Sequence, residues 1–288
     1  MFEILKKTLL APDIYFMEVH APRLAQSAQP GQFLIVRVDE NSERIPLTIA
    51  DFDREKGTIV IVTQALGVST RKIAAMNEGD CFANFAGPLG VPSELIHMSP
   101  DELKNLKVLF VAGGVGAAPI YPQVKFMADN GAKADVVLGA RTSDLFIFRD
   151  KLSAVSNRLL LATNDGSEGV KGLVTDAIAQ LVETEGKKYD MVVTIGPMIM
   201  MRAVADYTRK LGLKTIASLN TLMVDGTGMC GACRVSVGGK TRFTCVDGPE
   251  FDAHQVDFDE AMRRQGMYKR EEKKKLDDDH ECKIGIGR

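Results

Sequence analysis

The chain has 288 residues, of which 45% are hydrophobic and 26% are charged, a balance typical of a soluble globular protein with two domains and a small third part. Its formal net charge of −2 lacks the basic surplus that nucleic-acid binding requires. No apolar run approaches the roughly 18 residues that cross a bilayer, and residues 1–16 lack the apolar core and cleavage site of a secretory signal. We therefore expect a cytoplasmic protein with neither a nucleic-acid nor a membrane partner.

Residues 1–100 contain short apolar or alternating runs that are separated by turn residues. Two of these runs are 32–38 and 57–63, and Pro30-Gly31 and Gly87-Pro88 mark turns. Several short strands at this spacing are typical of a β-sandwich or β-barrel. We predict an antiparallel β-barrel over residues 1–100.

Residues 101–216 alternate between buried-type strands and helices. Strands are predicted at 107–112, 134–138, 159–162 and 191–195, with helices ending near residue 128, over 174–185 and from Met198 onward. Strands that alternate with helices in this way favour a doubly wound parallel sheet. We predict an α/β nucleotide-binding domain in this region.

A glycine-rich segment joins the first of these strands to the helix that follows it. The segment includes Gly113, Gly114, Gly116, Ala118 and Pro119. Backbone amides in this setting, at a helix N-terminus, can bind a pyrophosphate. The acidic residue that usually ends the second strand of a dinucleotide domain is missing, since this strand ends in Ala140-Arg141. Arg141 could accept a 2′-phosphate, so the residues leave NADP(H) open beside NAD(H).

Residues 217–262 combine glycine-rich turns with three of the five cysteines. Asp225, Cys230, Cys233 and Cys245 follow the spacing Asp-x4-Cys-x2-Cys-x11-Cys. With a cysteine in place of the aspartate, this is the plant-type ferredoxin pattern for a 2Fe–2S cluster. The interleaved glycines allow the backbone to curl closely around such a cluster. We predict a 2Fe–2S cluster module with these four side chains as ligands.

Two features of this module have other interpretations. Zinc is the main alternative to iron and sulfide, because cysteine, histidine and aspartate all bind it in tetrahedral sites. Asp225 could instead cap a loop, in which case Cys282 could supply a fourth thiolate. Cys282 lies in the charged tail over 263–288, for which we predict a solvated arm or a frayed helix, with partner docking as the alternative.

Two segments of the barrel region resemble the flavin motifs of the ferredoxin–NADP reductase superfamily. Arg44-Ile-Pro46-Leu47-Thr48 resembles its Arg-x-x-Ser/Thr motif, and Gly67-Val68-Ser69-Thr70 resembles its phosphate-binding element. The resemblance implies FAD, with Arg44 pairing with the pyrophosphate and the Ser69 and Thr70 hydroxyls near the remaining oxygens. It also implies that Thr48 lies near flavin N5. The alternative for Arg44 is an ordinary surface arginine.

The nucleotide domain carries two further elements of the same superfamily. Gly196-Pro197-Met198 resembles the nicotinamide-side Cys-Gly-Pro-x-x-Met element, with Ile195 in place of the frequent cysteine. Asp165, in the segment 164–167, matches a loop near the nucleotide. The resemblance implies NAD(H) as the hydride donor or acceptor.

The order of flavin barrel, nucleotide domain and cluster module resembles two related families. One is the electron-transfer subunit of dihydroorotate dehydrogenase, and the other is the small (beta) subunit of NADH-dependent ferredoxin:NADP⁺ oxidoreductase, also called sulfide dehydrogenase subunit beta. Asp225 among the cluster ligands favours the second. That resemblance implies a heterodimer with a larger iron–sulfur flavoprotein, which bifurcates electrons between ferredoxin and the 2Fe–2S cluster, FAD and NAD⁺ of this subunit.

Two other functions remain as alternatives to electron bifurcation. The nearer is the dihydroorotate dehydrogenase electron-transfer subunit, which has the same cofactors and a different partner. The more distant is a non-enzymatic iron–sulfur redox sensor, which would have no NADH:acceptor activity. Neither the bifurcating subunit nor the dihydroorotate dehydrogenase subunit requires a catalytic side chain, because the cofactors carry the hydride and the electrons.

Overall fold

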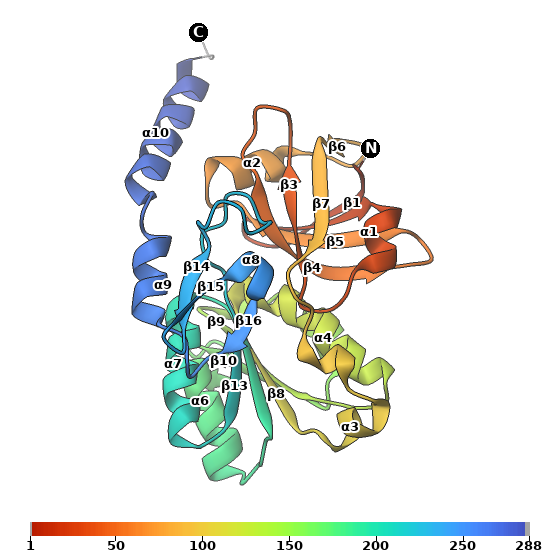
Figure 1. The fold of residues 1–288 in the computed structure, drawn as a ribbon, viewed down its shortest axis with the longest axis vertical. Coiled ribbons are helices and arrows are strands. Elements are labelled where there is room, and N and C mark those ends of the chain that lie inside the picture. Colours follow the sequence, from red (N-terminus) through yellow and green to blue (C-terminus); the bar gives the residue numbers. More distant parts are fainter. Residues whose placement is uncertain (1, 286–288) are drawn as a thin grey trace.

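The computed structural model describes residues 2–285, with side chains up to residue 277. Figure 1 shows a barrel at the N-terminus, an α/β domain beside it, and a C-terminal module that lies against both. No helix within residues 2–285 has the length and apolar character needed to cross a membrane.

The barrel is built from seven strands and two short helices. These are β1 (Phe2–Ala11), β2 (Ile14–His20), α1 (Pro22–Ser27), β3 (Phe33–Arg37), β4 (Ile45–Asp53), β5 (Thr58–Gln64), α2 (Val68–Ala75), β6 (Cys81–Phe82) and β7 (Asn84–Leu89). The strand order is β6-β1-β2-β5-β4-β3-β7 with antiparallel neighbours, which confirms the predicted barrel. Alternation along β5 directs Ile59 and Ile61 into the barrel core and Val60 and Val62 toward the second domain.

The α/β domain contains the predicted parallel sheet. Its elements are α3 (Pro100–Asn105), β8 (Val108–Gly113), α4 (Ala117–Asp129), β9 (Asp135–Ala140), α5 (Arg149–Val155), β10 (Arg158–Thr163), β11 (Val170–Lys171), α6 (Val174–Ala179), β12 (Met191–Ile195), α7 (Met198–Lys210) and β13 (Lys214–Ser218). The predicted helix over 174–185 is α6, which continues as a π-helical turn over Gln180–Thr184.

The central strand β8 explains why this sheet has helices on both faces. Phe110 packs in one apolar cluster with residues of α4, whereas Leu109 and Val111 pack in another with residues of α6 and α7. All three side chains are fully buried. A strand that is apolar on both faces requires cover on both sides, as in other parallel sheets.

The C-terminal module is tied into the α/β domain through its sheet. The module contains β14 (Arg234–Val237), β15 (Lys240–Phe243), α8 (Thr244–Asp247), β16 (Glu250–Asp252) and α9 (Phe258–Gln265), and α10 (Lys269–Gly285) follows it. Strand β16 pairs antiparallel with β13, so the sheet order is β11-β10-β9-β8-β12-β13-β16. The module is therefore an extension of the α/β domain that folds back toward the barrel.

The charged tail forms helix α10, which runs along the outer side of α2 (Figure 1). Nearly all of its side chains up to residue 277 are exposed. Lys275 forms an ion pair with Glu43 of the barrel, 2.5 Å between Nζ and Oε1. The Cys282 side chain, considered above as a fourth thiolate, lies outside the described residues.

Candidate functional site

A cavity of about 970 Å³ lies where the barrel, the α/β domain and the module meet. The predicted site residues that line it are Pro46, Thr48, Gly113, Gly114, Gly116, Pro119, Ala140, Arg141, Gly196 and Pro197. They come from β4 and from the carboxyl ends of β8, β9 and β12, which is the edge where parallel sheets bind ligands. The volume is at the upper end of the range for cofactor sites.

The rim of this cavity exposes large apolar side chains. Leu66, Leu173 and Ile199 line it with exposed fractions of 66%, 55% and 70%. Apolar side chains that gather around a concave surface mark a ligand site more often than isolated ones do. A ligand bound in the cavity would cover these apolar side chains.

Two glycines of the predicted phosphate loop are required by close backbone approach. A Cβ atom on Gly116 would lie 2.2 Å from the carbonyl oxygen of Ile195, and one on Gly113 would lie 2.3 Å from Sδ of Met200. The phosphate loop thus touches the segment that begins at Ile195. The backbone amides of 114–116 precede α4, where the helix dipole favours a negative charge. This arrangement fits the pyrophosphate of a nicotinamide nucleotide.

Glu43, which lies just before the first flavin motif, connects the two motifs through a hydrogen bond. Glu43 accepts a hydrogen bond from the Ser69 hydroxyl, 2.6 Å between Oγ and Oε2. Hydrogen bonds from Lys275 and then Ser69 hold the pKa of Glu43 below its usual range. The Thr70 hydroxyl accepts from the backbone amide of Gly67 at 2.9 Å, so it caps the start of α2. Both hydroxyls expected near the phosphate oxygens are thus engaged within the protein, Ser69 with Glu43 and Thr70 with the start of its own helix.

Several predicted site residues do not line the cavity. Ala118 and Met198 are buried in apolar clusters, and Leu47 packs against the barrel core. The Asp165 carboxylate accepts hydrogen bonds from the amide and hydroxyl of Ser167, which hold its pKa below the usual value, and its neighbour Asn164 lines the cavity instead. Arg44, Gly67, Val68, Ser69 and Thr70 also lie outside the lining, at the flank formed by α2.

The predicted cluster ligands form one buried pair and two more accessible groups. Cys233 and Cys245 are buried, with 3.2 Å between their Sγ atoms. Cys230 is exposed, and the Ala232 amide lowers the pKa of its thiol. The Asp225 carboxylate accepts hydrogen bonds from the amide and hydroxyl of Thr227. Among the described residues, no three potential ligands converge on one point.

The chemistry of the buried pair fits a strongly cationic group. Burial, followed by the proximity of Cys233, raises the pKa of the Cys245 thiol to about 12. Two adjacent buried thiols can both ionise only if a metal compensates their charge. Gly226, Gly228 and Gly231 have φ values of +85°, +87° and +66°, a conformation that gives the loop its tight curl. The donor set and the backbone therefore fit an iron–sulfur cluster.

The loop over residues 225–233, here called the cluster loop, packs directly on the N-terminal barrel. Cys233 and Cys245 share an apolar cluster with Phe33 and Ile35 of β3 and with Met223. A Cβ atom on Gly226 would lie 2.8 Å from Cγ1 of Ile35, so the loop is pressed against the strand. Phe33 and Met223 also line the cavity. Phe33 and Met223 therefore belong both to the lining of the cavity and to the apolar cluster that contains the buried cysteine pair.

The prediction from sequence missed the contribution that follows β13. Ser218, Leu219, Asn220 and Thr221 line the cavity, in addition to Met223. These residues follow the carboxyl end of a parallel strand, so the rule that such ends form ligand sites could have indicated them. They connect the cavity to the cluster loop along the chain.

Two family profiles match the chain. The profile described as the iron-sulfur cluster binding domain of dihydroorotate dehydrogenase B matches residues 220–257, and the oxidoreductase NAD-binding domain matches residues 110–206. A Thermotoga maritima homologue of the dihydroorotate dehydrogenase B (NAD⁺) electron transfer subunit is 43% identical over 94% of this chain and 93% of its own length. The chain belongs to this family of electron-transfer subunits. An uncharacterised Clostridium beijerinckii protein from the adh 3′ region is 56% identical over 95% of this chain and 93% of its own length.

Solved structures place the subunit in the ferredoxin–NADP reductase superfamily. A structure of the NADH-dependent reduced ferredoxin-NADP oxidoreductase, described for flavin-based electron bifurcation, is 42% identical, with a TM-score of 0.89 and coverage of 97% of this chain and 98% of that one. Cytochrome P450 reductase from Amycolatopsis shares the fold, with 17% identity and a TM-score of 0.60 over 73% of this chain and 65% of that one. The predicted family and fold are confirmed. The predicted cofactors, FAD, a 2Fe–2S cluster and NAD(H), are confirmed at the level of the family.

Proposed function

We propose that this protein is the small subunit of an electron-bifurcating NADH-dependent ferredoxin:NADP⁺ oxidoreductase. In this role it transfers electrons between NAD(H) and its 2Fe–2S cluster by way of FAD. The observation that carries the proposal is that Phe33 and Met223 both line the nucleotide cavity and belong to the apolar cluster that contains Cys233 and Cys245. Bound flavin supplies the needed chemistry, since it exchanges hydride with nicotinamide and single electrons with a cluster.

The residues of the chain have separate tasks in this proposal. The amides of 114–116 bind the nucleotide pyrophosphate, and Arg141 faces the cavity from the end of β9. Pro46 and Thr48 of β4 line the cavity, and they contact the flavin ring. Arg44 and the start of α2 bind the flavin pyrophosphate. Cys230, Cys233, Cys245 and Asp225 hold the cluster.

The partner in this proposal is a larger iron–sulfur flavoprotein that docks at the cluster loop and reaches ferredoxin on its own side. Val224 and Met229 lie in the segment just before Cys230, and Val246 follows Cys245 on α8; Met229, Val224 and Val246 have exposed fractions of 89%, 53% and 43%. Exposed apolar side chains around an accessible cluster ligand fit the centre of a protein interface. The 42% identity with the bifurcating oxidoreductase over 97% of the chain supports the same assembly.

A second candidate function is electron transfer for dihydroorotate dehydrogenase. The names of several relatives favour it, including one from Shouchella clausii that is 34% identical over 88% of this chain and 96% of its own length. Asp225 favours the first candidate, because the electron-transfer subunits of dihydroorotate dehydrogenase usually hold their cluster with four cysteines. Affinity purification from the native host under anaerobic conditions separates the two. Recovery of a large iron–sulfur flavoprotein supports bifurcation, and recovery of a dihydroorotate-oxidising subunit contradicts it.

The isolated subunit also distinguishes an enzyme from a redox sensor. Under the proposal, the purified chain reduces an artificial electron acceptor with NADH. A chain that holds both FAD and the cluster and still lacks this activity would support the sensor and overturn the enzyme.

A further inference from the structure

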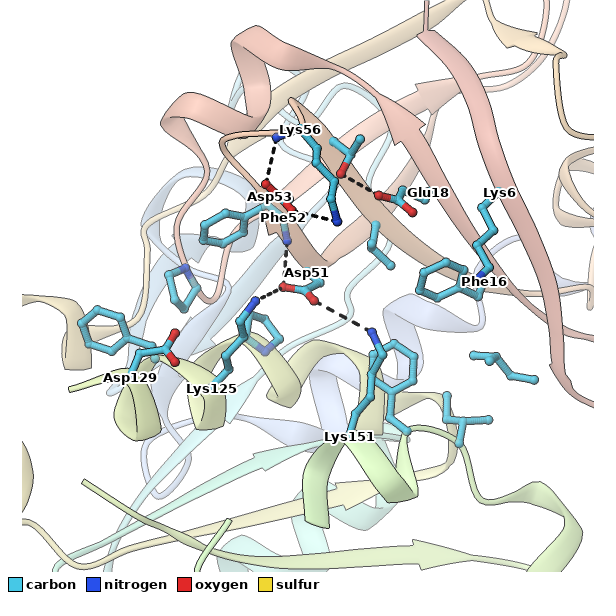
Figure 2. A pocket seen from close by; sticks show the side chains of 18 of the residues that line it. Lys6, Phe16, Glu18, Asp51, Phe52, Asp53, Lys56, Lys125, Asp129 and Lys151 are labelled. Atoms are coloured by element: carbon cyan, nitrogen blue, oxygen red, sulfur yellow. Dashed lines mark hydrogen bonds and ion pairs between the residues drawn. The ribbon is translucent and has the colours of Figure 1, made fainter. Parts of the chain in front are cut away.

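A second groove, of about 1160 Å³, lies on the barrel–α/β interface and is lined by different residues from those of the cofactor cavity. Its centre is Asp51, near the end of β4. The Asp51 carboxylate forms ion pairs with Lys125 of α4 at 2.9 Å and with Lys151 of α5 at 3.9 Å. Figure 2 shows Asp51 between these two lysines. We call this group of three residues the Asp51 bridge.

The Asp51 bridge is partly shielded from water. The Asp51 side chain is 17% exposed, and Lys125 and Lys151 are 37% and 43% exposed. Burial opposes the charge on Lys125, but its hydrogen bond and attraction to Asp51 outweigh this and raise the pKa of its ammonium group. A charge pair in such a setting imposes direction and distance on its partners. The neighbouring apolar contacts between Ala50, Val62 and α4 are non-directional and would tolerate sliding.

Aromatic rings hold Lys151 in place. Its Nζ atom lies 5.4 Å from the ring centroid of Phe16, 5.1 Å from that of Tyr121 and 5.0 Å from that of Phe148. Phe16 belongs to the barrel, and the other two rings belong to the α/β domain. Phe148 has a φ of +56°, which is unusual for a bulky residue and costs conformational energy. The ammonium group therefore adds cation–π contacts to both domains.

A β-bulge directs Asp51 toward the second domain. Ile49 pairs with Ile61 of β5, whereas Asp51 pairs with Val60, so β4 has one extra residue at Ala50. A bulge of this kind changes the side toward which the following side chains point. Ala50 and Asp51 consequently both face the α/β domain, and Ile49 remains in the barrel core.

The same two elements connect the Asp51 bridge to the cofactor cavity. Strand β4 lines the cavity at Thr48, about 10 Å along the strand from Asp51. Helix α4 begins beside Gly116, about 12 Å along the helix from Lys125. A change in the angle between β4 and α4 at the Asp51 bridge would therefore also change how the two elements are placed at the cavity.

We propose that Asp51 is a positioning residue for hydride transfer. It fixes the angle between the barrel and the α/β domain, and so the approach of the nicotinamide to the flavin ring. This inference rests on the proposed function, since it assumes that both rings occupy the cavity. Asp51, which lies outside the cavity, thus affects the rate of flavin reduction and has little effect on the affinity for the nucleotide.

The test compares Asp51→Asn with Asp53→Asn by rapid mixing with NADH. Asp53 is the matched control, because it pairs with Lys56 of its own turn and asparagine can still cap that turn. In Asp51→Asn the limiting rate of flavin reduction should fall about tenfold or more, since small displacements of reacting atoms are costly. The apparent Kd for NADH should change by less than about threefold, which is under about 0.7 kcal/mol of binding free energy. A limiting rate no lower than that of Asp53→Asn would overturn the inference.

Calorimetry of the same variants without added nucleotide supplies a readout other than activity. The wild type and Asp53→Asn should unfold with the barrel and the α/β domain coupled, whereas Asp51→Asn should separate them into two transitions.

If Asp51→Asn does not retain flavin, the double variant Lys125→Gln, Lys151→Gln removes both partners and leaves β4 unchanged. It should show the same loss of rate, and a normal rate would overturn the inference. A wild-type flavin that NADH does not reduce would instead overturn the proposed function.

Discussion

Arg44 donates a hydrogen bond from Nη2 to the backbone carbonyl oxygen of Asp225 at 3.3 Å, although 181 residues separate them in the chain. Arg44 begins the predicted flavin motif just before strand β4, and Asp225 is a predicted cluster ligand. The guanidinium group of Arg44 also helps to lower the pKa of the Asp225 carboxyl, after the larger effect of hydrogen bonds from Thr227. The flavin motif and the cluster loop are therefore in direct contact.

Replacement of Arg44 should weaken FAD binding and disturb the cluster at the same time. Arg44→Gln removes a charged donor, an effect of about 1.5–3 kcal/mol, so FAD affinity should fall roughly ten- to a hundredfold. Titration of the flavin-free protein with FAD and EPR of the reduced cluster measure the two effects. Arg23→Gln, on the exposed side of α1, is the control and should leave both unchanged. An unaltered FAD affinity in Arg44→Gln would mean that Arg44 is an ordinary surface arginine.

Substitutions of Asp225 separate cluster ligation from capping of the loop. Asn can accept the hydrogen bonds from Thr227 but cannot supply an anionic ligand, whereas Cys can ligate iron but cannot cap in the same way. If Asp225 binds iron, Asp225→Asn should lose or alter the cluster, and Asp225→Cys should retain it with changed g values and midpoint potential. EPR-monitored redox titration checks both. An Asn variant indistinguishable from wild type would contradict ligation.

Gly116→Ala should weaken binding of the nicotinamide nucleotide while FAD is retained. The new methyl group would overlap the carbonyl oxygen of Ile195 at 2.2 Å, so the phosphate loop must move away from the Ile195–Pro197 segment. Such an overlap is relieved by a backbone shift, and we expect a loss of roughly tenfold in affinity for NADH, about 1.4 kcal/mol of binding free energy. Gly266→Ala is the control, because its nearest neighbour, the Arg263 carbonyl oxygen, is at 3.4 Å. Equal NADH affinity in the two variants would argue against a nucleotide at this loop.

The stability of the protein should depend on pH through Glu250. Part of this residue is exposed, but its carboxyl group is enclosed where β16, α4 and the segment after β7 meet, and it accepts a hydrogen bond from Gln123 at 2.6 Å. Burial raises the pKa of Glu250 to about 7, although the hydrogen bonds from Gln123 and Ser93 lower it. The folded state thus binds this proton more tightly than the unfolded chain, whose carboxyl titrates near 4.3. The stabilisation is complete below that pH and is lost as the pH rises toward 7.

Glu250→Gln tests this dependence. The variant should be more stable than the wild type at pH 8, by about 1–3 kcal/mol, and the difference should vanish near pH 4. Denaturant unfolding at several pH values measures it. Glu55→Gln, a surface variant, should show no such trend. A difference between Glu250→Gln and wild type that stays constant from pH 4 to pH 8 would contradict the assignment.

The sequence predicted the elements that local patterns specify. The apolar run at 107–112 followed by glycines is β8 and the phosphate loop, and the runs at 134–138, 159–162 and 191–195 are β9, β10 and β12. These predictions succeeded because a strand buried on both faces must be continuously apolar. The four-position spacing around Cys230 indicated an iron–sulfur module for a similarly local reason, which the matching family profile supports.

Contacts between distant segments left no such pattern. Nothing near Asp51 in the sequence indicates that a bulge turns it toward Lys125, and nothing near Gly226 indicates Ile35 as its neighbour. Met198 illustrates the same dependence on distant contacts. It belongs to an element expected at the nicotinamide, but its side chain packs in the apolar core with Phe251 of the module.

The central claim is that nicotinamide, flavin and an iron–sulfur cluster form one electron-transfer path in this single chain. Anaerobic titration of the purified subunit with NADH, followed in the visible spectrum and by EPR, tests it most directly. We expect one FAD and two irons per chain without zinc, bleaching of the flavin absorbance, and the EPR signal of a reduced 2Fe–2S cluster. Flavin that bleaches while the cluster stays oxidised at every NADH concentration, or zinc in place of iron, would contradict the account.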